Sequence, residues 1–205
     1  MSPGIVAAIY SSIFWAISQA SLKKSFRELA PSIAFFIDSL FGLVLLIPLS
    51  LFLGVNFATL PQVISYATLS AVLSEAFVFY ALSKGQLSLT AILIGTYPIY
   101  TILFSFFINH EVLTAAQGSF IALTIIGTLI SYIPPKLNMS ELKKSGALLW
   151  PVLAAIAIGL SDSLSKKIIN QTGDYTFLFA LALIQIPVAL IYLKLEKNNQ
   201  SNNFF

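Results

Sequence analysis

The chain has no cysteine, a single histidine (His110) and few charged residues, which make up 9% of its 205 residues. Disulfides and thiolate metal sites are therefore excluded, and so is a metal cluster built from histidines. The net charge of +3 comes from short clusters between apolar runs, which argues against nucleic-acid binding. The sequence holds no phosphate-binding glycine loop and no recognisable catalytic set. We therefore expect neither an enzyme nor a bound cofactor.

Hydrophobic residues are abundant instead, at 58% of the chain. Soluble domains carry about 45–50% apolar and about 25% charged residues, so this composition is typical of membrane proteins. A bilayer core about 30 Å thick is crossed by roughly 17–25 apolar helical residues. We predict an all-α, multi-pass integral membrane protein in the lipid bilayer, with seven transmembrane helices over residues 5–22, 32–53, 62–82, 88–109, 114–133, 147–166 and 175–193.

Two stretches of the chain are alike. Residues 17–24 and 160–167 each close an apolar run with a polar stripe and a lysine pair, 143 positions apart. Five helix-length segments lie between the starts of these runs, so the second copy re-enters the membrane inverted. We predict a five-helix repeat over 1–133, a linking loop over 134–146 and the start of an inverted repeat over 147–205. Inverted repeats are typical of secondary transporters, which favours a carrier of a small molecule working by alternating access.

Three acidic residues fall within the predicted spans, where each ionised group costs about 2.5–3.5 kcal/mol. Glu75 lies deep in the third span, and we expect it to handle substrate or protons. Asp38 shares a helix face with Ala34 and Gly42, so we expect it to point into the bundle. For Asp38, a functional role and a structural hydrogen bond stay open as alternatives.

The third acid, Asp162, has Lys166 four residues later on the same helix face. We expect a local ion pair there, with a functional role as the alternative. In the first repeat the matching stripe holds Gln19, with Trp15 one turn earlier. Together with Tyr97 of the fourth span, these residues complete the predicted substrate-binding set: Glu75, Tyr97, Trp15, Gln19, Asp38 and Asp162.

The fourth span contains Pro98, which removes a backbone N–H and predicts a helix kink. Polar residues follow at steps of four. They either line a polar cavity or bond back to the helix and to a neighbour: Tyr97, Thr101, Ser105 and Asn109. The next residues, His110 and Glu111, are expected in a solvated turn.

The stretch from Tyr80 to Tyr132 resembles the EamA-type transporters of the drug/metabolite transporter superfamily. The similarity lies in the Tyr97-Pro98 step, in the acidic turn and the Gln-Gly pair between Glu111 and Gly118, and in Gly127. The start of the chain, with Trp15 and Lys23, is similar too. Two positions depart from the family pattern, since Asp38 and Val112 stand where the family often has arginine. Both departures weaken any transfer of the family's substrate preferences.

The resemblance implies two inverted repeats of five helices, whereas this chain has five helices plus two. We therefore expect an incomplete carrier that lacks about three helices, with a natural seven-helix protein as the alternative. The expected location is the plasma membrane of a prokaryote, and a homodimer that completes the cavity stays open. The alternative function is a non-transporting membrane scaffold or assembly subunit, or an inactive truncated product.

Overall fold

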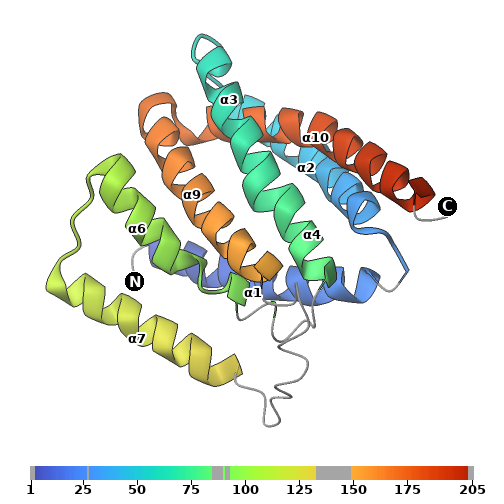
Figure 1. Cartoon of the computed structure of the whole chain (residues 1–205). Coiled ribbons are helices and arrows are strands. Elements are labelled where there is room, and N and C mark those ends of the chain that lie inside the picture. Colours follow the sequence, from blue (N-terminus) through green and yellow to red (C-terminus); the bar gives the residue numbers. More distant parts are fainter. Residues whose placement is uncertain (1–2, 27, 85–89, 91–92, 133–148, 203–205) are drawn as a thin grey trace.

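The computed structural model describes residues 3–26, 28–84, 90, 93–132 and 149–202, which form helices and turns with no strand (Figure 1). Three consecutive elements, α3, η1 and α4, continue one another as a single rod. The helices are α1 (Pro3–Ser25), α2 (Pro31–Leu53), α3 (Leu60–Ser70), η1 (Ala71–Ala76), α4 (Phe77–Lys84), α6 (Tyr97–Asn109), α7 (Ala115–Tyr132), α9 (Leu149–Thr172) and α10 (Asp174–Asn202).

Within the described residues, four stretches are long and apolar enough to cross a membrane: Gly4–Leu22, Pro31–Leu53, Leu60–Ser83 and Asp174–Asn198. Helix α6 and the Ala115–Gly127 part of α7 are apolar but shorter. Helix α9 is 24 residues long, but it is not among the four and carries Asp162 and two lysines. The predicted class, a helical membrane protein, is confirmed. The count of seven spans is not, because parts of the fourth to sixth segments and the whole 134–146 loop lie outside the described residues.

The tightest packing joins α2 to α10 and α6 to α9, while α3 bridges α9 and α10. Small side chains make this close approach possible. Ala189 of α10 is fully buried against Phe35 of α2, next to Ala34 and Phe79. In a membrane, apolar side chains gain little by leaving lipid, so close packing of small residues is what holds helices together.

The beginning of α2 is fixed by the end of α10. Pro31 occupies the first turn of α2, where its missing N–H costs nothing. The N–H of Ser32 donates to Oε2 of Glu196, 3.0 Å away and 164 residues later in the chain. This acidic partner suits the positive end of the helix dipole, so α2 and α10 are held in register at this end.

Helix α7 lies outside this packed group, whereas α1 crosses beneath it and contacts it through Leu22 (Figure 1). Helix α7 runs apart from α9 and α10, and its apolar side chains are exposed, among them Phe120, Leu123 and Ile130. Ile5, Ile9 and Ile13 of α1 are exposed as well. Helices with apolar residues all round are typical of a lipid environment, so these two surfaces suit the bilayer.

Candidate functional site

A cavity of about 390 Å³ lies where α1, α2, η1, α4, α6 and α9 meet. Its walls include five of the six side chains predicted to bind substrate. These are Trp15, Asp38, Glu75, Tyr97 and Asp162. The side chain of the sixth, Gln19, lies outside the described part of the structure. The volume falls in the range of small-molecule sites, about 300–1,000 Å³.

Glu75 reaches the cavity from a π-helical turn. The N–H of Phe77 donates to the carbonyl of Val72, five residues earlier, where an α-helix would use the fourth. Such turns insert one extra residue into a helix and are frequent at functional sites. Among the described residues, no side chain donates a hydrogen bond or forms an ion pair with the Glu75 carboxylate. The neighbouring Ser74 also lines the cavity, and its Oγ is buried without a partner in the same set.

Asp38 enters from α2, one turn after the buried Ala34 and one turn before Gly42. A Cβ placed on Gly42 would lie 3.0 Å from Oε1 of Gln185, so this face of α2 packs closely on α10. The predicted close packing of the small-residue face is therefore confirmed. The Asp38 side chain is exposed and lines the cavity. Within the described residues it forms no structural hydrogen bond.

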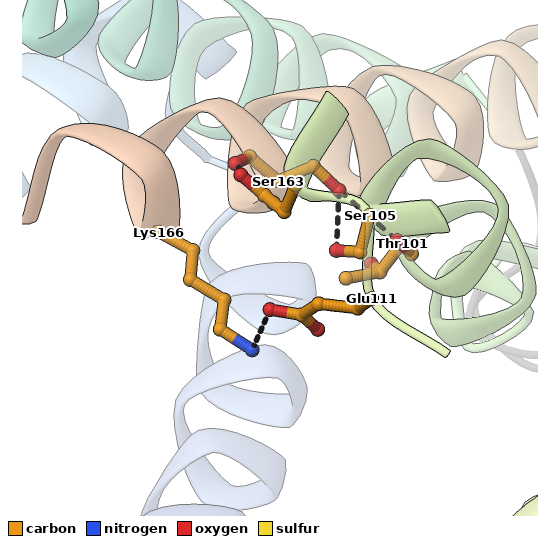
Figure 2. Close-up of polar contacts among 6 residues, drawn as sticks. Thr101, Ser105, Glu111, Ser163 and Lys166 are labelled. Carbon is orange, nitrogen blue, oxygen red and sulfur yellow. Dashed lines mark hydrogen bonds and ion pairs between the residues drawn. The ribbon is translucent and has the colours of Figure 1, made fainter. Parts of the chain in front are cut away.

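Asp162 does not form the ion pair that the sequence predicted. Its Oδ2 accepts a hydrogen bond from Oγ1 of Thr101, 3.3 Å away, and its side chain lines the cavity. Lys166 instead lies 2.6 Å from Oε1 of Glu111, at the end of α6 (Figure 2). The prediction of an Asp162–Lys166 pair was wrong, because α6 and the turn after it supply each side chain with another partner, Thr101 for Asp162 and Glu111 for Lys166.

Glu111 lies in the exposed turn after α6, as the sequence predicted, but its ion pair with Lys166 was not predicted. His110 ends α6 in the left-handed conformation, with φ 55° and ψ 33°. This turn redirects the chain so that Glu111 faces α9. The left-handed conformation is uncommon for residues other than glycine, and the sequence patterns considered above did not predict it at His110.

Residues of α6 and α9 face one another along a line that we call the α6–α9 seam: Thr101, Ser105 and Asn109 of α6, and Gly159 and Ser163 of α9. The hydroxyls of Ser105 and Ser163 are 3.0 Å apart, and Ser163 also donates to the Thr101 carbonyl at 3.0 Å (Figure 2). Nδ2 of Asn109 donates to the Ser163 carbonyl at 3.0 Å. The sequence left two alternatives for the polar residues of α6. Tyr97 lines the cavity, whereas Thr101, Ser105 and Asn109 bind the neighbouring helix α9.

Pro98 begins a helix where the sequence predicted a kink. A turn at Gly95 and Thr96 precedes α6, and Oγ1 of Thr96 donates to the Leu93 carbonyl at 2.6 Å. Pro98 lies in the first turn of α6, where no N–H is required. The break places Tyr97 at the cavity, with its ring edge-to-face against Trp15 at a centroid distance of 5.9 Å.

Comparison with known proteins gives one match. The model of the EamA-like transporter family matches residues 2–133, which is more than half of the chain. No curated protein and no solved structure matches. The match covers the residues of α1 to α7, and therefore four of the five predicted site residues found at the cavity.

Proposed function

The chain belongs to the EamA-like transporter family, within the drug/metabolite transporter superfamily, and we propose that it is a secondary carrier for a small molecule that binds in the cavity. The observation that carries this proposal is the convergence of Trp15, Asp38, Glu75, Tyr97 and Asp162 on one space of about 390 Å³. Polar and ionisable groups inside a membrane protein are costly and usually mark a pathway or binding site. The broken helix before Tyr97 supports the proposal, because interrupted helices commonly form transporter sites.

Alternating access between inverted repeats is the mechanism we propose. Helices α2 and α10 begin at Pro31 and Asp174, 143 residues apart, the same offset as between the two lysine-pair motifs. Gly42 and Gln185 differ by the same 143 positions, and they meet across the α2–α10 contact. Equivalent residues of two repeats meet where an axis of pseudo-symmetry passes between them. This geometry supports α2 and α10 as equivalent helices of two repeats related by the 143-residue offset.

In this mechanism the cavity opens alternately to the two sides of the membrane. Glu75 binds substrate or carries a proton at the centre, and Asp38 and Asp162 complete the polar wall. The reaction is binding and release without covalent chemistry, and the chain acts as a carrier and not an enzyme. We place it in the plasma membrane of a prokaryote, with the bilayer as its solvent, and a homodimer is compatible with the exposed faces of α1 and α7.

The test has two stages. The purified chain in detergent is screened for thermal stabilisation by amino acids, amines and nucleosides, because a bound ligand raises the stability of the folded state. Radiolabelled forms of the stabilising compounds are then supplied to proteoliposomes of the native chain, of Glu75→Gln and of Glu28→Gln. Glu28 is an exposed acid outside the cavity and serves as the control.

Saturable uptake by the native chain and by Glu28→Gln, with loss of uptake in Glu75→Gln, would support the proposal. Unchanged uptake in Glu75→Gln would remove the role assigned to that residue. The carrier function is wrong if no compound stabilises the protein and none enters the proteoliposomes faster than it enters protein-free liposomes. That result would favour the scaffold alternative.

A further inference from the structure

The charged side chains that the structure describes at the cavity are all acidic. The three acidic residues inside the spans come from three different helical elements, α2, η1 and α9, yet Asp38, Glu75 and Asp162 line one space. None of the side chains described at this cavity is basic. The described basic residue nearest in sequence to Asp162 on the same face of α9, Lys166, is engaged by Glu111. The local charge is therefore the opposite of the chain's net charge of +3.

Charge of one sign in a cavity with apolar walls attracts the opposite charge strongly. Field lines concentrate in a space bounded by low-dielectric material, and the Coulomb energy of a pair rises as water is excluded. When ionised, the three carboxylates also repel one another. A positively charged ligand relieves that repulsion, whereas an anion adds to it.

The spacing of the acids argues against a single metal ion as that ligand. Within the described part of the chain, no group of three acidic or histidine side chains is close enough to hold a metal. The cavity is also large for one ion. A molecule that reaches several carboxylates at once, with an apolar body, fits the dimensions better.

Aromatic side chains at the cavity supply a second means of binding a cation. Trp15 and Tyr97 are edge-to-face at 88° on one side of the cavity, and Phe79 lines it as well. Tryptophan and tyrosine rings attract organic cations placed over their faces, and recognition of quaternary ammonium groups is a common use of such rings. The buried and unpartnered Oγ of Ser74 offers one further hydrogen-bonding group.

We propose that the cavity selects small organic cations, namely amines or quaternary ammonium compounds with an aromatic or aliphatic body. This inference rests on the proposed function, because it assigns the charge of the molecule that the carrier binds. The carboxylates bind the positive group, and Trp15 and Tyr97 hold the apolar part.

The experiment compares two probes of similar size and opposite charge. The full chain in detergent is dialysed to equilibrium against radiolabelled benzyltrimethylammonium or 3-phenylpropionate. We expect saturable binding of the cation and none of the anion. Glu75→Gln and Asp162→Asn should each weaken cation binding about tenfold, since a charged partner in a buried site is lost. The control variant Glu28→Gln should bind as the native chain does.

Equal binding of the two probes, absence of saturable cation binding, or unchanged affinity in both cavity variants would each overturn the inference. The comparison of probes on the native chain does not depend on whether a variant folds. Counterflow of the cation is then measured in proteoliposomes. Carboxylate-dependent binding without counterflow supports the charge selectivity and contradicts the carrier function. Transport of a neutral or anionic metabolite without cation binding supports the carrier function and contradicts the charge selectivity.

Discussion

The cavity and the α6–α9 seam share the helices α6 and α9, yet polar side chains are used differently in the two regions. In the seam, each hydroxyl or amide meets a partner on the facing helix, as Ser105 and Asn109 do with Ser163. In the cavity, the Oγ of Ser74 is buried without a hydrogen-bond partner, and no side chain among the described residues bonds to the Glu75 carboxylate. Asp162 lies at the border, because it accepts a hydrogen bond from Thr101 and also faces the open space.

The difference shows that the type of a polar residue inside a membrane does not reveal its role. Interhelical hydrogen bonds stabilise a membrane bundle by roughly 0.6–2 kcal/mol each, so the seam residues hold the fold together. Polar groups that face a cavity stay available to a ligand. Variants of the seam should therefore act on stability, and variants of the cavity on binding.

The largest effect is expected at Gly159, where α9 approaches the backbone of α6. A Cβ at this position would lie 2.6 Å from the Thr101 nitrogen and 2.6 Å from Cβ of Tyr100. Gly159→Ala should destabilise the chain by about 3 kcal/mol, because backbone atoms must move apart. Thermal unfolding in detergent, followed by circular dichroism, measures the loss. Gly118→Ala is the control, since nothing lies within 4 Å of its added Cβ. Equal Tm values for Gly159→Ala and the native chain would show that the seam is looser than described.

Asp162→Asn separates binding from stability on the cavity side. The asparagine oxygen keeps an acceptor for Thr101, while the negative charge is removed. We expect about tenfold weaker ligand binding with the Tm unchanged, because the hydrogen bond is retained and the ligand's charged partner is lost. A fall in Tm as large as that of a seam variant, with normal binding, would assign Asp162 to the seam.

Ser163→Ala is the matched change on the seam side, one residue further along α9. It removes a hydroxyl that bonds to Ser105 and to the Thr101 carbonyl. The expected destabilisation is about 1–2 kcal/mol, with ligand affinity within about twofold of the native value. The same unfolding and binding assays check both outcomes. Reduced affinity at an unchanged Tm would contradict the division between seam and cavity.

The smallest effect is expected for the ion pair of Glu111 and Lys166, which remain 37% and 51% exposed. Exposed pairs contribute about 0.2–1 kcal/mol and are screened by salt. A double-mutant cycle with Glu111→Gln and Lys166→Met should give a coupling energy in that range at low salt. The coupling should shrink at about 1 M salt. A coupling that does not change with salt would indicate a pair shielded from water.

Much of the architecture was predictable from the sequence. The apolar runs and the scarcity of charge indicate a helical membrane protein, and acids within those runs drew attention to Asp38, Glu75 and Asp162. The role of each acid was harder to predict, as Asp162 shows. Its spacing from Lys166 permits a local ion pair, but the pairing depends on where Glu111 lies. The left-handed turn at His110 sets that position, and the apolar runs and spacings of the sequence did not predict this turn.

The sequence by itself determined the class of protein. Burying charged side chains or unpaired backbone groups in lipid is costly, so the composition and the length of the apolar runs indicate a membrane protein directly. The sequence also contains two similar stretches 143 positions apart, on which the prediction of a repeat is based. Only the tertiary structure decided which polar side chains pair and which stay open to a ligand. Helix spacing fixes which residues share a face, but the neighbour opposite that face comes from packing between distant segments. The contact of Gly159 with α6 and the cavity beside it are set by that packing.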